Sequence, residues 1–248
     1  MARPAQAKVV AVIPSLNTAS TIHEVVSKAK KYVNQVIVIN DGSHDGTMEA
    51  ARAAGALVKS HSTNRGYGEA IKSCFQAARA SGADVFVILD GDRQHNPDEI
   101  PRLVNPVLNQ EADVVIGSRF LQSEESMSAK PQTMVPKYRA FGIKVITFLW
   151  NFGSATKVSD AQSGFRAYSK NAFQYLSLSE RGMGVSIETL EKARRKGAVI
   201  KEVPISCFYA PSTLNLKAIS HGINVALSTV RIRLMNSLRS LIRGSRGT

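Results

Sequence analysis

Short runs of β-branched residues alternate with helix-forming segments through the first half of this sequence. The runs are largely apolar, as is typical of strands buried on both faces, and they lie at Val9–Ile13, Val36–Ile39, Ala56–Lys59, Val85–Leu89 and Val114–Ile116. Helical patterns fill the intervals at Ser20–Tyr32, Thr47–Ala54, Gly68–Ser81 and Asp98–Leu108. Ser20 is the expected N-cap of the first helix, and Asn96-Pro97 precede the last. This alternation predicts an α/β fold, in which a mostly parallel sheet carries helices on both faces.

Polar segments follow all five expected strands. They are Pro14–Thr18, Asn40–Gly46, Asn64–Gly68, Asp90–Gln94 and Gly117–Arg119. In parallel α/β sheets, ligands bind beyond the carboxyl ends of the strands, and those ends share one edge. One such segment is commonplace, but five together predict a single large polar site.

Three oxygen-bearing side chains, Asp90, Asp92 and Gln94, stand at alternating positions after one buried run. Mg²⁺ and Mn²⁺ prefer oxygen ligands, commonly one or two carboxylates together with substrate phosphates. The segment therefore predicts a divalent metal site beside a nucleotide diphosphate, and the alternative is a solvated Asp-Gly turn. Asp41 is interpreted either as a turn residue or as an acceptor for a nucleobase edge. Arg65–Gly68 is interpreted as a glycine-rich approach to a helix N-terminus that binds phosphate.

The pattern changes after Leu121. Gln122–Pro136 is polar and predicts a loop, and the elements expected after it are a helix at Lys137–Phe152, a turn or short strand at Ser159–Tyr168, a helix at Ser186–Lys196 and a strand at Val199–Phe208. Asn215–Arg243 carries apolar residues at helical spacing, namely Leu216, Ile219, Ile223, Leu227, Val230, Leu234, Leu238 and Leu241. We expect one domain over residues 1–210, with halves at 1–120 and 121–210, and a basic amphipathic helix over 211–248.

The formal net charge of +13 favours an anionic partner such as nucleic acid, a phosphorylated ligand or anionic lipid. No acidic residue follows Glu202, whereas several arginines do, which fits a helix in the interface of an anionic membrane. No window reaches the roughly 20 apolar residues of a spanning helix, and no signal segment is visible. The sequence thus predicts an intracellular protein without an integral membrane segment. Cys74 and Cys207 form no metal or redox spacing and are expected in the core.

Six motifs in order resemble those of glycosyltransferase family 2 and, within it, the polyprenyl-phosphate glycosyltransferases typified by dolichol-phosphate mannose synthase. The matching segments are Ile13–Asn17, Val38–Thr47, Leu89–Pro97, Gly117–Arg119, Asp160–Arg166 and Glu202–Ser206, and the resemblance covers residues 8–220. It implies a GT-A fold with a Rossmann-like sheet, a nucleotide-sugar donor, Mg²⁺ or Mn²⁺, and a dolichyl or polyprenyl phosphate acceptor.

The resemblance also implies roles for individual residues. The expected donor contacts are Pro14, Leu16, Thr18, Ile39, Asp41, Gly91 and Asp92. Asp90, Asp92 and Gln94 correspond to the metal ligands, and Asp92 and Arg119 to the catalytic pair. The residues expected to bind the acceptor phosphate are Arg119, Lys137, Arg139 and Ser163. Arg166 lies in the same acceptor-side segment as Ser163, and Glu188 matches an acidic position on a later helix.

Two departures from the family pattern concern the donor. Leu16-Asn-Thr18 stands where relatives often have Tyr-Asn-Glu. After the Val-Pro-Ile segment many relatives carry an arginine and then Gly-Glu-Ser-Lys-Leu, but here Thr213 occupies the lysine position. Guanosine and mannose are therefore not implied over a uridine diphosphate sugar, and Lys217 is a candidate replacement for the missing cation.

A polyprenyl monophosphate is largely dianionic at neutral pH and needs no general base. We therefore expect in-line attack of phosphate on the anomeric carbon with inversion, on the cytoplasmic face of the membrane. The alternative is a family 2 enzyme for a soluble or cell-surface saccharide, with Asp160 as its base. A nucleic-acid-binding protein and an inactive nucleotide-sugar-binding regulator explain less, because the first leaves the five strand ends unused. A membrane-anchoring partner or a second copy of the chain is compatible with the pattern.

Overall fold

The computed structural model describes residues 7–121, 135–209 and 224–232 of the chain, and only the backbone of residues 173–175. Seven strands form one sheet in the order β3-β2-β1-β4-β6-β5-β7. Their bounds are β1 Val9–Ser15, β2 Gln35–Asn40, β3 Leu57–Ser60, β4 Val85–Ile88, β5 Val114–Ser118, β6 Arg166–Ser169 and β7 Ile200–Pro204. Only β6 runs antiparallel to its neighbours β4 and β5. The expected mostly parallel sheet is confirmed.

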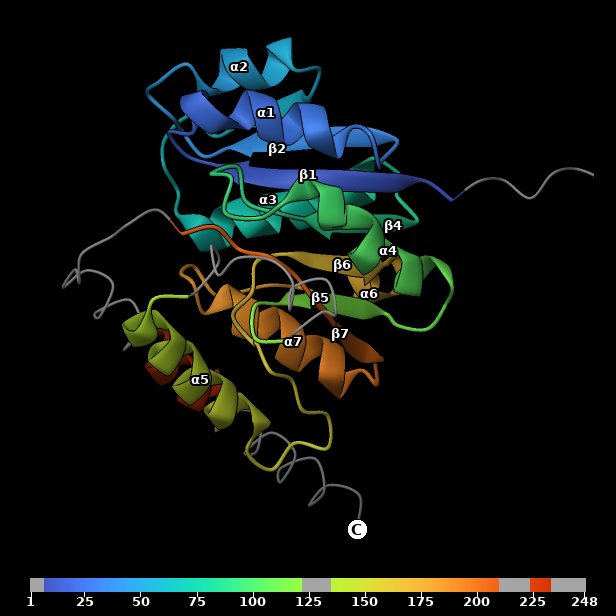
Figure 1. The fold of residues 1–248 in the computed structure, drawn as a ribbon, viewed down its shortest axis with the longest axis vertical. Coiled ribbons are helices and arrows are strands. Elements are labelled where there is room, and N and C mark those ends of the chain that lie inside the picture. Colours follow the sequence, from blue (N-terminus) through green and yellow to red (C-terminus); the bar gives the residue numbers. More distant parts are fainter. Residues whose placement is uncertain (1–6, 122–134, 210–223, 233–248) are drawn as a thin grey trace, which may run out of the picture.

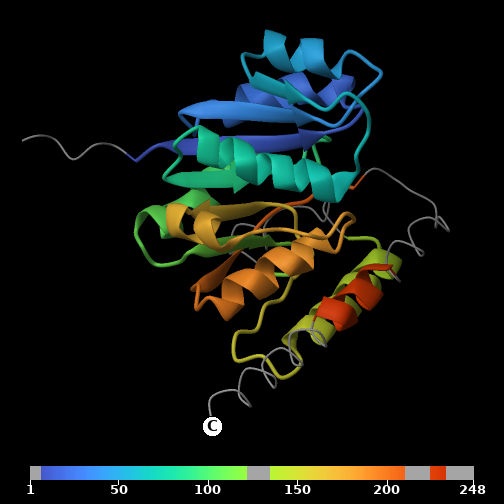
Figure 2. The same cartoon turned by 180° about the vertical axis from the view of Figure 1, so that it is seen from behind.

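Helices cover both faces of the sheet, as Figures 1 and 2 show from opposite sides. They are α1 Ala19–Ala29, α2 Thr47–Ala53, α3 Tyr67–Ala80, the short 3₁₀ turn η1 Pro97–Glu99, α4 Ile100–Leu108, α5 Lys137–Asn151, α6 Lys170–Tyr175 and α7 Val185–Arg195. One hydrophobic core lies between the sheet and α1, α2 and α4, and the other between the sheet and α3, α5 and α7. Alternate residues of β1 supply the two cores, with Val12 facing one and Ile13 the other. All seven residues of β1 are buried, which explains why its sequence is apolar throughout.

Two local expectations are wrong. The run at Ala56–Lys59 contains an edge strand, β3, and Leu57 is 49% exposed because only β2 pairs with it. Ser20 is not the N-cap of α1, since the cap is Thr18 and its side chain makes no capping hydrogen bond. By contrast, Asn96 accepts a hydrogen bond from the Asp98 amide at 3.1 Å and Pro97 begins the 3₁₀ turn, as expected. Cys74 and Cys207 are both buried.

The five polar segments do reach one edge of the sheet. β1, β2, β3 and β4 are parallel, and β5 has the same direction because β6 opposes both β4 and β5. The carboxyl ends of all five strands therefore lie together. The two expected halves of the domain share this one sheet.

Residues 224–232 form a helix that lies beside α5 in both ribbon views. Val225 and Thr229 are buried there, so this part of the expected C-terminal helix packs on the domain, while Leu227 is 63% exposed. The remainder of the apolar stripe, Thr213, Lys217 and most of the expected loop lie outside the described residues. Within the described part, no helix has the length and apolarity needed to span a membrane.

Candidate active site

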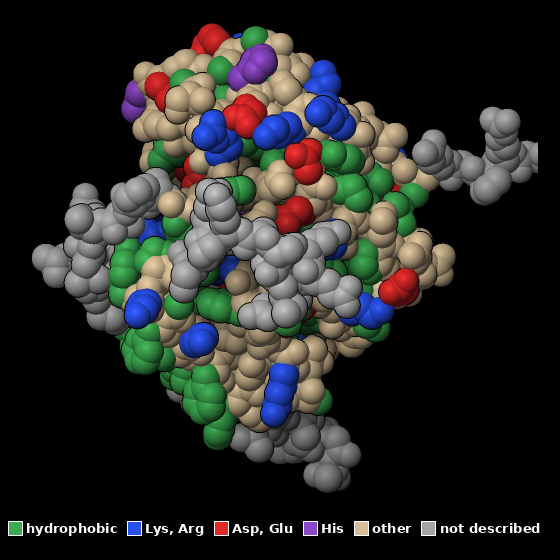
Figure 3. Space-filling model, viewed as in Figure 1, with side chains coloured by type: hydrophobic (Ala, Val, Ile, Leu, Met, Phe, Trp, Pro, Cys, Tyr) green, Lys and Arg blue, Asp and Glu red, His purple; other side chains and the backbone are tan. Residues whose placement is uncertain are grey.

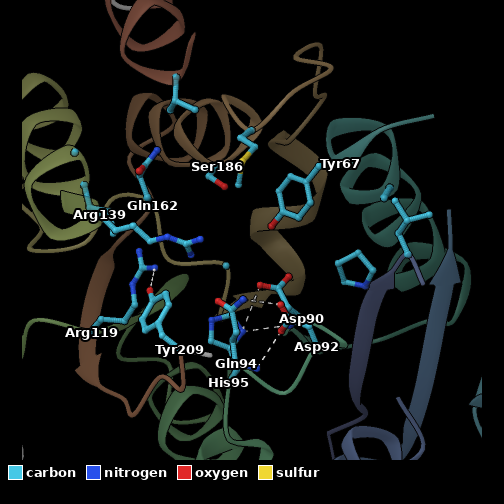
Figure 4. Close-up of a pocket in the computed structure, with 18 of the residues that line it drawn as sticks. Tyr67, Asp90, Asp92, Gln94, His95, Arg119, Arg139, Gln162, Ser186 and Tyr209 are labelled. Carbon is cyan, nitrogen blue, oxygen red and sulfur yellow. Dashed lines mark hydrogen bonds and ion pairs between the residues drawn. The ribbon is translucent and has the colours of Figure 1, made fainter. Parts of the chain in front are cut away.

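A cavity of about 960 Å³ opens at the carboxyl edge of the sheet. It is polar at the strand ends and apolar where α5 and residues 224–232 form its wall (Figure 4). The predicted site residues that line it are Pro14, Leu16, Thr18, Asp41, Asp90, Gly91, Asp92, Gln94, Arg119 and Arg139. The structure thus brings most of the sequence-predicted residues together.

The acidic end of the cavity is formed by the loop after β4. Gln94 donates its side-chain amide to Asp92 at 2.7 Å and its backbone N–H to the same carboxylate at 3.0 Å. Desolvation by the cavity walls raises the pKa of Asp90 to about 6, and it raises that of Asp92 as well, with the charge of Asp90 adding to the effect. Burial thus disfavours the charged form of both acids, although Arg119 partly offsets the shift at Asp90.

This donor set fits a divalent cation. Two carboxylates and one amide oxygen are the ligands that Mg²⁺ or Mn²⁺ takes from protein, with phosphates and water completing the shell. In the part of the chain that the structure describes, no group of three or more His, Cys, Asp or Glu is arranged to hold a metal. Asp90, Asp92 and Gln94 are therefore the residues that would hold it, and a bound phosphate would have to supply further ligands.

His95 belongs to the same loop, although the sequence did not single it out. The Asp90 amide donates to His95 Nδ1 at 3.3 Å, and the imidazole ring lies 5.2 Å from the Phe165 ring. Burial, with the charge of Arg119, lowers the pKa of His95 to about 4. The imidazole is therefore neutral at physiological pH and holds the loop by accepting a hydrogen bond.

Asp41 anchors the loop on the nucleotide side of the cavity. It accepts hydrogen bonds from the backbone N–H groups of Arg65 and Gly66, both at 2.9 Å, and lies 2.6 Å from His61 Nδ1. Gly66 has φ +89°, which favours glycine, and it immediately precedes α3. Asp41 therefore organises this turn, as one interpretation expects, and it also lines the cavity, while its contact with a nucleobase stays a prediction.

Tyr67, the first residue of α3, faces Asp90 across the cavity (Figure 4). Burial raises the pKa of this phenol well above its usual value. The next residue, Gly68, lies against the backbone of Arg181 and donates to its carbonyl at 2.9 Å. At the N-terminus of α3, where the sequence predicts a phosphate, the Gly68 amide is thus already bonded to the protein backbone.

Arg119 and Asp160 form a bidentate ion pair at the other end. Arg119 donates from Nε and Nη2 to the two carboxylate oxygens of Asp160 at 2.6 and 2.8 Å. Burial alone would lower the pKa of Arg119, but the hydrogen bonds and charge of Asp160 outweigh it and raise that pKa. Asp160 is fully buried and does not line the cavity. The hypothesis that Asp160 is a general base is therefore wrong, because its carboxylate orients the arginine.

Three predicted residues do not reach the cavity. Ile39 is 1% exposed in the core, Lys137 begins α5 outside the lining, and Ser163 is buried with its hydroxyl accepting from the Phe165 amide at 3.3 Å. Arg166 and Glu188 are also structural. Arg166 donates to the Ala161 and Ser186 carbonyls, and Glu188 accepts from Ser179 and the Glu180 amide.

Tyr209 is a further lining residue that sequence reasoning missed. Its hydroxyl accepts from Arg119 Nη1 at 2.8 Å, and the Arg139 guanidinium lies 5.5 Å from the centre of its ring. Burial raises the pKa of Tyr209 to about 12, so the phenol stays neutral beside the two arginines. The segment that contains Tyr209 departs from the family pattern, and this departure is the feature of the sequence that could have drawn attention to it.

A mostly parallel sheet with a carboxylate pair after β4 has the architecture of GT-A glycosyltransferases. Glucosyl-3-phosphoglycerate synthase from Mycobacterium tuberculosis, solved with Mn²⁺, uridine diphosphate and glucosyl-3-phosphoglycerate, superposes with a TM-score of 0.69 over 93% of this chain and 85% of that chain. The sequence identity is 22%, so this likeness shows the shared fold.

The family follows from the sequence. Residues 10–176 match the model described as Glycosyl transferase family 2, and this chain belongs to that family. The uncharacterized protein MJ1222 of Methanocaldococcus jannaschii is 34% identical over 86% of this chain and 85% of its own length. The UDP-N-acetylglucosamine–dolichyl-phosphate N-acetylglucosaminyltransferase of Methanococcus voltae is 29% identical over 87% of this chain and 90% of its own length.

Proposed function

We propose that this protein transfers a sugar, with inversion, from a nucleotide sugar to a polyprenyl or dolichyl monophosphate. The observation that carries the proposal is the continuity of one cavity. Its carboxylates, Asp90 and Asp92, lie on one side, Arg119 and Arg139 lie on the other (Figure 4), and the lining from α5 and residues 224–232 is largely apolar. The two ligands match these surroundings, because the donor carries a diphosphate that a metal at the carboxylates would neutralise, and the acceptor carries a monophosphate for the arginines and a hydrocarbon chain for the apolar lining.

The apolar wall supports a lipid rather than a saccharide acceptor. It includes Phe141, Val145 and Ile146 of α5, Val225 and Ala226 of the neighbouring helix, and Met183. Sugars require hydrogen-bonding groups that these side chains do not have. A prenyl chain would bury apolar surface against them, with its phosphate toward Arg119 and Arg139.

The described lining also contains no carboxylate left over to serve as a general base. Its acidic residues are Asp41, Asp90 and Asp92. Asp41 already accepts three hydrogen bonds, and the other two form the predicted metal site. A saccharide hydroxyl needs a base to become a nucleophile, whereas a phosphate dianion does not. The cavity therefore favours the phosphate acceptor.

In this mechanism, Asp90, Asp92 and Gln94 would hold Mg²⁺ or Mn²⁺, which neutralises the charge of a departing nucleoside diphosphate when bound. Arg119, fixed by Asp160, and Arg139 hold the acceptor phosphate against its repulsion from the donor diphosphate. Their contribution is positioning and charge stabilisation, so that a phosphate oxygen is aligned with the anomeric carbon. Pro14, Leu16, Thr18 and Asp41 bind the nucleoside.

The donor is best sought among uridine diphosphate sugars. The Methanococcus voltae relative is named for such a donor, and the similar solved structure was obtained with uridine diphosphate. In many relatives a lysine that would hold the donor diphosphate stands where this chain has Thr213, so the guanosine and mannose of those relatives do not carry over to this chain. GDP-mannose therefore belongs in the same panel as the second choice.

Reaching a lipid acceptor requires contact with a membrane surface. Phe148 and Phe152 are 65% and 71% exposed, and Lys137, Arg139 and Lys144 lie on the same helix. Figure 3 shows apolar side chains gathered over α5 with Lys and Arg beside them. Aromatic side chains flanked by cations suit the interface of an anionic bilayer.

The test is transfer of radiolabelled sugar into lipid. The protein is incubated with Mn²⁺, a panel of UDP- and GDP-sugars and vesicles that contain a polyprenyl monophosphate. We expect label in the organic phase with one donor, abolished by EDTA. Label transferred instead to soluble saccharides would overturn the proposal in favour of the alternative acceptor, and binding of nucleotide without any turnover would favour an inactive regulator.

A further inference from the structure

Tyr209 contacts both arginines at the acceptor end of the cavity. Its hydroxyl accepts from Arg119 Nη1 at 2.8 Å, and its ring lies beneath the Arg139 guanidinium, 5.5 Å away. Arg119 follows β5 and Arg139 belongs to α5. One aromatic side chain therefore joins cations from two elements that are separate in the sequence.

The hydrogen bonds of Arg119 show what this joining achieves. A guanidinium has five N–H groups. Asp160 takes the Nε–H and one from Nη2, and Tyr209 takes one from Nη1. One N–H on each terminal nitrogen is not used by these three bonds and is left to donate to a phosphate.

The backbone next to Tyr209 is hydrogen-bonded to the loop after β4, which carries the proposed metal ligands. Cys207 forms an antiparallel bridge with His95, and the Phe208 amide donates to the Gln94 carbonyl at 2.8 Å. The Tyr209 side chain thus extends from a segment hydrogen-bonded to the loop that carries Asp90 and Asp92.

We propose that Tyr209 is the positioning residue of the acceptor site, which sets Arg119 and Arg139 as a two-arginine clamp for a phosphate monoester. The inference rests on the proposed function for the identity of the acceptor. It adds a residue in a segment where the chain departs from its family. The hydroxyl orients Arg119 through a hydrogen bond, and the ring holds Arg139 through a cation–π contact.

The test separates these two contacts with Tyr209→Phe and Tyr209→Leu. The probe is farnesyl monophosphate, titrated calorimetrically into each protein in the presence of UDP and Mn²⁺ and used as an acceptor in transfer assays. Tyr209→Phe keeps the ring and should weaken binding about threefold, because one hydrogen bond is lost. Tyr209→Leu loses both contacts and should weaken it about tenfold or more.

Further measurements distinguish positioning from general damage. The KM for farnesyl phosphate should rise in the same order, while the affinity for UDP with Mn²⁺ stays within about twofold of wild type. In an Arg139→Gln background, Tyr209→Phe and Tyr209→Leu should become equivalent, because the cation above the ring is gone. Tyr32→Phe, which removes an exposed hydroxyl bonded to Asp98, is the matched control and should change nothing.

Each outcome decides the inference. If wild type binds farnesyl phosphate and both variants bind it equally well, Tyr209 has no positioning role and the proposed function still stands. Equal loss of UDP and farnesyl phosphate binding would also overturn it, since Tyr209 would then support the whole site. If wild type binds the probe but transfers no sugar, the proposed function fails, and the ordered loss across the variants still supports Tyr209. Absence of any binding by wild type overturns both.

Discussion

The two ends of the cavity are built in different ways. At the proposed donor end, Asp41 directly follows β2, Asp90 and Asp92 lie in the loop after β4, and backbone amides hold Asp41 in place. At the acceptor end, Arg119 depends on Asp160 and Tyr209, which lie 41 and 90 residues away in the sequence. The sheet therefore brings all of these residues to one edge, and the orientation of the Arg119 side chain depends in addition on side-chain contacts with more distant segments.

This difference has a consequence for tolerance to substitution. A residue at a strand end keeps its place when a neighbour changes, because the ladder hydrogen bonds of the sheet remain. A side chain that is held by an ion pair and by a hydrogen bond to a phenol loses its orientation when either partner is substituted. Substitutions at the donor end should remove chemistry while the fold survives, and substitutions at the acceptor end should disturb structure and function together.

The largest expected effect is at the donor end. Asp92→Asn and Asp90→Asn should each lower the rate of sugar transfer about a thousandfold, because the metal site loses a carboxylate. The fold should survive, since the side chain of Asp92 is hydrogen-bonded to its near neighbour Gln94 and, among the residues that the structure describes, not to another element of the fold. Thermal shifts with UDP and Mn²⁺ check this result, and we expect the stabilisation by ligand to vanish while the ligand-free melting temperature is kept. Retained ligand stabilisation would show that the metal lies elsewhere.

The second effect is at the acceptor end. Asp160→Asn should lower the free energy of unfolding by about 3 kcal/mol, because it leaves the mostly buried Arg119 guanidinium without its counter-charge. Activity should fall as well, since Arg119 is no longer oriented. Urea unfolding measures the free energy of unfolding of this variant. Glu111→Gln is the control, because it breaks a half-exposed pair with Lys201 and should leave stability unchanged.

The same difference explains what could be predicted from the sequence. Period and composition predict strands and helices, and the rule for parallel sheets then places residues such as Asp41, Asp90 and Arg119 at one edge. The motifs of the family add the roles of these residues. Local patterns therefore sufficed wherever a functional residue follows its own strand.

Partners contributed by distant segments could not be predicted in this way. Asp160 was the candidate base of the alternative with a saccharide acceptor, because a sequence shows a carboxylate but not the arginine that pairs with it. Tyr209 gave no signal of its own, since its role comes from Arg119 and Arg139. Ser163 and Ile39 follow the family motif, yet their side chains point into packed regions rather than into the cavity. The burial of β3 was misjudged because strand order, which makes it an edge, is a tertiary property.

A third prediction concerns the contact between Gly68 of α3 and the backbone of Arg181. Gly68→Ala should lower the free energy of unfolding by about 2 kcal/mol, because its Cβ would clash with the backbone carbonyl group of Arg181. The loop that carries Arg181 would have to move away from α3. This helix lines the cavity with Tyr67 and Ala70. Gly182→Ala in the same loop is the matched control, since a Cβ there meets nothing within 4 Å. Equal stability of the two variants in urea unfolding would mean that the loop and α3 adjust independently.

The smallest effect, and the one confined to the acceptor side, concerns the exposed face of α5. Phe148→Ser and Phe152→Ser should each reduce partition into anionic vesicles about tenfold, the loss expected when one large apolar side chain no longer enters the bilayer interface. Stability and binding of UDP with Mn²⁺ should be unchanged, because both rings are mostly exposed. Leu57→Ser, on the edge strand β3, removes an apolar side chain that is 49% exposed at the opposite end of the sheet from β7 and should not alter partition. Vesicle sedimentation distinguishes the two faces. If Leu57→Ser weakens binding as much as Phe148→Ser, the membrane contact is not specific to α5, and the acceptor would have to enter the cavity by another route.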